Sequence, residues 1–119
     1  MGAEDPQGGY PVVLRLAIRV RPGERENLLE FFRQAFPFYE APGGIQMRLL
    51  QQLDDPDSFI EEVRYQGGAE YERDNVRVES DPEMKQYLDR WRSLLAGRPE
   101  VTAYREVTAD IRGTEPEDE

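Results

Sequence analysis

The sequence contains no histidine and no cysteine. Without cysteine the chain can form neither a disulfide nor a thiolate nucleophile. Without either residue it lacks the thiolate and imidazole ligands that hold most zinc, iron–sulfur and haem groups in proteins. Most metal, haem-ligand and thiol chemistry is therefore excluded, and we expect neither a metal site nor a cofactor.

Long apolar runs and an excess of basic residues are absent as well. No apolar stretch approaches the roughly 20 residues that a membrane-spanning helix requires, and residues 1–6 have neither the basic nor the apolar region of a signal peptide. The net charge of −10 argues against a nucleic-acid partner, because phosphate binding needs a basic face. Since the lack of cysteine fits a reducing compartment, we expect a cytoplasmic protein that contacts neither membrane nor nucleic acid.

The length of 119 residues suits one domain. Apolar residues make up 38% of the chain, and their periodic clusters lie between residues 12 and 107. The two ends, residues 1–11 and 108–119, are instead acidic and contain glycine or proline. Because such segments are usually solvated, we expect two disordered tails around a folded domain at 12–107.

Alternation of apolar and polar residues predicts four strands. They are expected at residues 12–20, 45–53, 58–66 and 101–107. The second and third strands should form a hairpin around Asp54-Asp55-Pro56-Asp57, because aspartates bond nearby backbone amides and proline fixes φ in turns.

Apolar residues at spacings of three and four predict the helices. The first helix should begin at Pro22 and end near Phe36, because Pro37 disfavours its continuation. A short second helix is expected at 69–78. Asp81, as an N-cap before a proline, should start the last helix.

The resulting order of strand, helix, strand, strand, helix, strand is that of the ferredoxin-like βαββαβ sandwich, an α+β fold. Its four-stranded antiparallel sheet carries both crossover helices on one face, because right-handed crossovers place them on the same side. The helix-covered face should hold Leu14, Leu16, Ile18 and Val20. The other face is left either to water or to a second copy of the sheet.

Four arginines should lie on that open face, namely Arg15, Arg19, Arg48 and Arg64. One interpretation is an anion site inside a dimer. The other is pairing with acidic residues such as Glu62 and Glu106, or simple solvation.

Short proline- and glycine-containing segments between these elements carry a resemblance to a known family. They are Arg21-Pro22-Gly23-Glu24, Ala41-Pro42-Gly43-Gly44-Ile45, Asp54-Asp55-Pro56-Asp57-Ser58-Phe59 and Arg98-Pro99-Glu100-Val101. With the helices between them, they make residues 12–107 resemble the antibiotic biosynthesis monooxygenase-like family of the dimeric α/β barrel superfamily. The resemblance implies a homodimer in which the open faces of two sheets pack together into an eight-stranded barrel.

The same family resemblance indicates a function. The family includes cofactor-free oxygenases of aromatic polyketides and haem-degrading oxygenases that hold iron through a histidine. Because this chain has no histidine, we reject the haem-degrading branch. We expect a cofactor-independent oxygenase of a small aromatic or quinol substrate; the alternative is a non-catalytic domain for small-ligand binding or assembly on the same dimer.

An oxygenase of this kind needs an apolar pocket, a group that takes a phenolic proton and donors for the resulting anion. We predict the catalytic residues to be Trp91, Tyr65 and Asn75, and the ligand-binding residues to be Arg64, Tyr71 and Tyr87. Tyr65 stands where the family often places a tryptophan, and Tyr39 is a further candidate. Trp91 has an alternative role in core packing, because it lies in an apolar helical seam. Glu61 and Glu62 point to opposite faces of a strand and therefore cannot form a catalytic pair.

Overall fold

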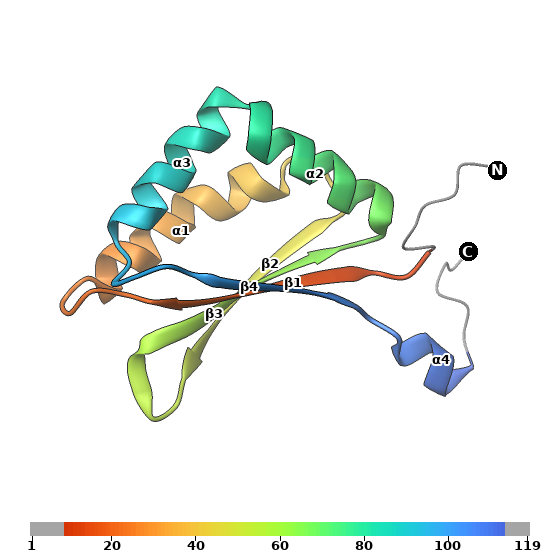
Figure 1. Cartoon of the computed structure of the whole chain (residues 1–119), viewed down its shortest axis with the longest axis horizontal. Helices are drawn as coiled ribbons and strands as arrows, with labels where there is room; N and C mark the ends of the chain where they lie inside the picture. The colour runs from red at the N-terminus through yellow and green to blue at the C-terminus, as the bar shows by residue number, and fades with distance from the viewer. Residues whose placement is uncertain (1–8, 114–119) are drawn as a thin grey trace.

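The computed structural model describes residues 9–113 and contains one sheet with helices on one side of it (Figure 1). The elements are β1 (Val12–Arg19), α1 (Arg25–Glu40), β2 (Ile45–Gln52), β3 (Asp55–Tyr65), α2 (Gly68–Ser80), α3 (Pro82–Ser93), β4 (Glu100–Arg105) and α4 (Thr108–Arg112). The strands pair antiparallel in the order β2-β3-β1-β4. Helices α1, α2 and α3 cover one face and leave the other bare, which confirms the ferredoxin-like α+β prediction.

The register of the sheet assigns side chains to its two faces. Leu16 lies opposite Glu61, whereas the neighbouring Arg15 lies opposite Glu62. The helix-covered face packs against aromatic and aliphatic side chains of α1 and α3. The buried core cluster there includes Ile18, Leu28, Phe31, Phe32, Ala35, Met84 and Trp91. The predicted division of β1 into a helix-facing and an open side is therefore confirmed.

Helix α1 runs past Pro37 to Glu40, so the prediction that it ends near Phe36 is wrong. A proline in this position removes one intrahelical hydrogen bond. The turn that follows is held by packing instead, because Tyr39 is buried and the Phe38 ring stacks on Tyr87 with 4.6 Å between centroids. Tertiary contacts thus outweigh the local preference.

Strand β3 begins at Asp55, three residues before the predicted start at 58, so the segment 54–57 is not all turn. The register shifts between Gln51 and Gln52, which places a bulge beside the hairpin end. The Asp55 carboxylate accepts hydrogen bonds from Arg19 and Ser58. These contacts tie the end of the hairpin to β1.

Helix α2 spans Gly68–Ser80 and is longer than predicted, and the backbone continues directly into α3. Asp81 accepts a hydrogen bond from the Glu83 N–H at 2.9 Å, which confirms it as the N-cap of α3. Strand β4 ends at Arg105, before the predicted end at 107. Over the described part of the chain, no helix combines the length and apolar character needed to cross a membrane.

The short helix α4 lies within the segment that was expected to be a disordered tail, so the prediction is wrong for Thr108–Arg112. The Tyr10 hydroxyl donates a hydrogen bond to Asp110 at 2.7 Å, which links α4 to the chain just before β1. The rest of the two predicted tails, residues 1–8 and 114–119, lies outside the described residues.

Candidate functional site

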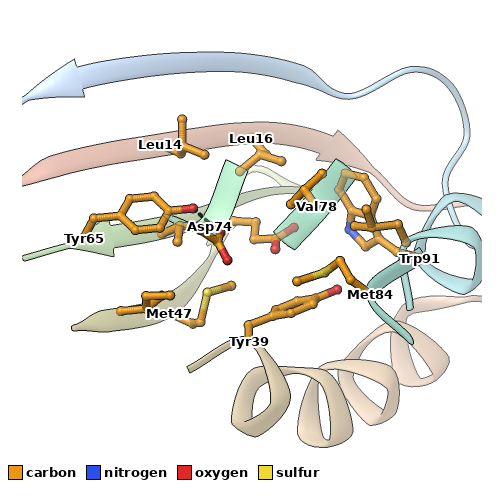
Figure 2. A pocket seen from close by; sticks show the side chains of 13 residues that line it. Leu14, Leu16, Tyr39, Met47, Tyr65, Asp74, Val78, Met84 and Trp91 are labelled. Atoms are coloured by element: carbon orange, nitrogen blue, oxygen red, sulfur yellow. Dashed lines mark hydrogen bonds between the residues drawn. The ribbon is translucent and has the colours of Figure 1, made fainter. Parts of the chain in front are cut away.

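A cavity of about 100 Å³ lies between the helix-covered face of the sheet and helices α1, α2 and α3 (Figure 2). Most of its wall is apolar, with Leu14, Leu16, Ile45, Met47, Val63 and Met84. Its polar or aromatic lining residues are Tyr39, Glu61, Tyr65, Asp74 and Trp91. A small apolar chamber with a few converging polar groups is the usual form of a small-molecule site.

Glu61 is the most unusual residue of the cavity. It sits in the middle of β3, opposite Leu16 of β1 and Leu49 of β2, and only 5% of its surface is exposed. Burial raises the pKa of its carboxyl from the ordinary 4.5 to about 8, and the neighbouring Trp91 indole offsets this only in part. Glu61 is therefore protonated in most molecules at neutral pH and is converted to a carboxylate under mildly alkaline conditions.

Two buried polar atoms of the cavity have no hydrogen-bond partner among the described residues. They are Glu61 Oε1 and the indole nitrogen of Trp91, Nε1. Buried polar groups are nearly always paired with protein, water or ligand. This carboxyl and this N–H can therefore each form a hydrogen bond with water or with a ligand.

A second polar group is already satisfied within the protein. The Tyr65 hydroxyl donates to Asp74 at 2.6 Å, and the dashed line in Figure 2 marks this contact. Burial, followed by the hydrogen bond to Asp74, raises the pKa of Tyr65 far above its usual value. Burial and the nearby Glu61 raise the pKa of Tyr39 as well. Both tyrosines are consequently neutral phenols over the physiological pH range.

Of the predicted catalytic residues, Trp91 and Tyr65 line the cavity and Asn75 does not. Asn75 is exposed on α2, because it directly follows Asp74 and one helical residue turns the side chain by about 100°. Asn75 therefore lies outside the cavity that Trp91 and Tyr65 line.

None of the three predicted ligand-binding residues lines this cavity. The Tyr71 ring packs edge-on against Tyr65 at 5.3 Å, and so supports the wall from behind. Tyr87 belongs to the aromatic cluster around Phe38. Arg64 projects from the opposite side of the sheet, where it donates to Glu106 at 3.0 Å. These three residues therefore lie outside the cavity, and their binding of a ligand stays a prediction.

The sequence analysis missed Glu61 and Asp74 as site residues. Glu61 shares the alternation of Phe59, Val63 and Tyr65, which all face the helices. A charged residue at a core-facing position of a central strand is the signal that would have identified it. Glu61 and Glu62 do point to opposite faces of β3, as predicted. Because we considered them only as a pair, we did not consider Glu61 as a single residue of the cavity.

The open face of the sheet carries the four arginines, and each one has an acidic partner. Glu62, 8% exposed, lies between Arg48 at 2.6 Å and Arg15 at 3.5 Å. Arg19 pairs with Asp55, and Arg64 pairs with Glu106. This arrangement favours the pairing interpretation over an anion site.

Comparison with known proteins identifies the fold. No protein-family model matches the sequence, and no curated protein matches it. Among solved structures, a protein described as an antibiotic biosynthesis monooxygenase from Nitrosomonas europaea aligns with a TM-score of 0.69 and 17% identity, covering 90% of this chain and 96% of its own. A conserved protein from Methanosarcina mazei aligns with a TM-score of 0.70 and 14% identity, covering 84% and 96% of the two chains.

A third match is a mutant of SnoaB, a cofactor-independent oxygenase from Streptomyces nogalater. It aligns with a TM-score of 0.66 and 16% identity, covering 79% of this chain and 90% of its own. Similarity at these identities extends to the backbone arrangement. The chain therefore has the fold of the antibiotic biosynthesis monooxygenases, as the segments between its strands and helices predicted.

Proposed function

We propose that this protein is a cofactor-independent oxygenase that binds a small hydroxylated aromatic ring in the cavity. The observation that carries the proposal is the pair of Glu61 Oε1 and Trp91 Nε1, which have no hydrogen-bond partner among the described residues, inside a mostly apolar chamber. A phenolic hydroxyl matches both atoms, because it donates one hydrogen bond and accepts others. It would donate to the ionised Glu61 carboxylate and accept from the Trp91 N–H.

The pKa of Glu61 suits a general base. A catalytic base works best when its pKa lies near the operating pH, and the pKa of Glu61 is about 8. The ionised form takes the phenolic proton, and the Trp91 N–H then stabilises the phenolate oxygen. The chamber keeps this anion away from bulk water, which strengthens that hydrogen bond.

Molecular oxygen is the oxidant in this proposal. The phenolate is electron-rich at a ring carbon, which bonds to one oxygen atom and forms a hydroperoxide. Loss of water from the hydroperoxide leaves a second carbonyl on the ring. A phenol and O₂ thus become a quinone and water, and the substrate itself supplies all four electrons that reduce the two oxygen atoms. The fold shared with SnoaB, described as a cofactor-independent oxygenase, supports this reaction class.

The size of the cavity limits the substrate to a single ring. An engineered cavity of about 150 Å³ in another protein binds benzene. The chamber of about 100 Å³ is of the same order and would hold a monocyclic phenol after a small adjustment of its flexible Met47 and Met84 side chains.

We further propose that two copies pack their open sheet faces together into a barrel. Exposed or half-exposed apolar side chains on this face, Ala17, Leu50, Ile60 and Tyr104, surround the ion-paired Glu62. The pairs of Glu62 with Arg15 and Arg48 remove the local cost of bringing unpaired charges into an interface.

The test of the oxygenase is aerobic incubation with monocyclic phenols and hydroquinones. We expect oxygen uptake with at least one of them, incorporation of one atom from ¹⁸O₂ into the product, and an activity that rises between pH 7 and 9. Glu61→Gln should abolish the uptake. Glu62→Gln, which removes the neighbouring carboxylate on the other face, should retain it.

The second candidate is a binding domain without catalysis, which the small volume of the chamber favours. In that case a phenol would raise the melting temperature of the protein, and Glu61→Gln would reduce this effect, while the oxygen concentration stayed constant. This combination of results would refute the oxygenase proposal and support a binding domain without catalysis.

A further inference from the structure

The cavity wall contains acidic groups and no basic group among the described residues. Its lining includes the two carboxyl groups of Glu61 and Asp74 and none of the described lysines or arginines. Asp74 has partners, because it accepts from Tyr65 at 2.6 Å and lies 3.5 Å from Arg77, which is not a lining residue. Among residues 9–113, Glu61 Oε1 has no hydrogen-bond partner, and no cation lies beside it in the lining. The cavity therefore lacks a positive charge at Glu61.

The remaining walls suit an organic cation. The rings of Tyr39, Tyr65 and Trp91 line the same chamber, and so do the thioethers of Met47 and Met84. The face of an aromatic ring carries negative charge density, which attracts ammonium groups, and tryptophan is the strongest of the three ring types. A carboxylate that lies among several rings is a common arrangement for binding a protonated amine.

We propose that the cavity binds protonated arylalkylamines, which carry an ammonium group on a short alkyl chain beside the ring, with Glu61 as their counter-ion, and that these amines compete with the hydroxylated ring for the site. The proposal rests on the ligand cavity of the proposed function, but it does not depend on the oxygen chemistry. An anionic ring such as a benzoate would face Asp74 without any cation in the lining and should be excluded.

Binding of an amine should also release a proton. The titratable groups that face Glu61 are Tyr39 from α1, Tyr65 from β3 and Asp74 from α2, whereas β1, β2 and α3 present only apolar residues and Trp91. Both tyrosines remain neutral near pH 7, because the pKa of each is raised. Since the pKa of Glu61 is about 8, this residue holds a proton in the free protein and loses it when an ammonium arrives.

Three probes of nearly equal size and different charge test the proposal: benzylamine, benzyl alcohol and benzoate. Isothermal titration calorimetry at pH 7 should show benzylamine binding about tenfold tighter than benzyl alcohol, and benzoate not binding. Titration in buffers of different ionisation heat should show that benzylamine, but not benzyl alcohol, releases close to one proton. Benzylamine should also inhibit any oxygen uptake competitively.

Glu61→Gln should reduce the affinity for benzylamine to that for benzyl alcohol, while Glu62→Gln should leave all three affinities unchanged. Equal affinities in the wild-type protein, or tighter binding of benzoate, would overturn the proposal. So would a benzylamine preference that survives in Glu61→Gln. If that variant does not fold, the wild-type protein still tests the proposal. Release of close to one proton on benzylamine binding would support Glu61 as the counter-ion, and release of no proton would overturn it.

The failures of the two proposals are distinguishable. If none of the three probes binds, the ligand cavity itself is refuted and both proposals fall. If the probes bind without the charge preference, only the amine proposal falls. If benzylamine binds as expected but no phenol causes oxygen uptake, the amine site stands and the oxygenase is refuted.

Discussion

The hydroxyl of Tyr65 donates a 2.6 Å hydrogen bond to Asp74, which joins the central strand β3 to helix α2. This contact matters for the stability of α2, because the helix buries few apolar side chains. Among the described residues of α2, only Gly68 is fully buried. The helix is otherwise held by the Tyr71 ring against Tyr65 and by Arg77 at the end of α1. A small set of polar contacts therefore holds α2 in place over the cavity.

Removing the Tyr65 hydroxyl should weaken the attachment of α2 to the sheet. We expect Tyr65→Phe to lower the free energy of unfolding by about 1–3 kcal/mol, because a hydrogen bond to a charged group is lost and Asp74 is left half-satisfied. Tyr71→Phe is the matched control, since no residue in the described range 9–113 forms a hydrogen bond with the Tyr71 hydroxyl and the ring packing is kept. Urea unfolding measures the loss, and hydrogen exchange should locate faster opening in α2.

Equal destabilisation by the two variants would contradict this role of Tyr65. So would an exchange pattern in Tyr65→Phe that changes evenly over the whole protein, because the contact would then act on global stability and not on α2.

Glu61 should make the protein less stable as the pH rises. Its pKa in the folded state, about 8, lies above its ordinary value of 4.5. Between these values the unfolded chain has lost the proton that the folded chain still holds, so the free energy of unfolding falls with pH. Over the full interval the fall is on the order of 4 kcal/mol. Urea unfolding at pH 5, 6, 7 and 8 measures it.

The comparison of two glutamine variants isolates this effect. Glu61→Gln should flatten the pH dependence and be more stable than the wild type at pH 8. Glu62→Gln should keep the slope, because Glu62 lies on the other face between two arginines. An unchanged slope in Glu61→Gln would show that other groups cause the pH dependence.

The fold was predictable because its signals are local and repeated. The alternation in residues 12–20 and the cap at Asp81 each specify an element without knowledge of its neighbours. The incorrect boundaries occur where distant residues decide. Helix α1 continues past Pro37 because α3 supplies Tyr87, and Arg19 of β1 holds the Asp55 side chain at the start of β3.

The site was predictable only in part, for a related reason. Trp91 and Tyr65 are large residues on core-facing positions, so their presence in the cavity follows from periodicity. Asn75 was selected for its chemistry, and one helical step from Asp74 takes it to the surface. The proposed role of Glu61 depends on the lack of a cation in the described part of the cavity lining, which only the assembled helices and strands reveal.

Arg77 should stabilise the C-terminal end of α1. Its guanidinium donates to the carbonyl oxygens of Phe38 and Tyr39, lies 4.4 Å from the Phe38 ring centroid and pairs with Asp74. These carbonyls belong to the turn that follows Pro37, where the helix is weakest. We expect Arg77→Ala to cost about 3–5 kcal/mol, since it leaves a buried carboxylate and the carbonyl groups without a cation.

A conservative variant separates charge from geometry. Arg77→Lys keeps the charge but loses the planar fork that reaches two carbonyls, and should recover less than half of the stability. Arg73→Ala is the control on the same helix. Arg73 is exposed and donates a surface hydrogen bond to the Gly43 carbonyl oxygen, so its loss should cost about 0–1 kcal/mol. Denaturant unfolding of the three variants measures these losses. Full recovery with lysine would refute the role of the guanidinium shape.

A charge on the open sheet face should separate the proposed dimer. Ile60 lies in the centre of that face, between Ala17 of β1 and Leu50 of β2. Ile60→Asp would place an unpaired carboxylate in the interface, where burying it costs several kcal/mol. Sedimentation equilibrium should give the mass of two 13.8 kDa chains for the wild type and of one chain for the variant.

The control for this experiment is a similar change on the helix side. Val76 is 63% exposed on α2, so Val76→Asp adds the same charge away from the open face and should leave the dimer intact. If the wild-type protein sediments as a single chain, or if the two variants dissociate alike, the open face is not the interface. The ion pairs around Glu62 would then serve only to neutralise charge on a face that water covers.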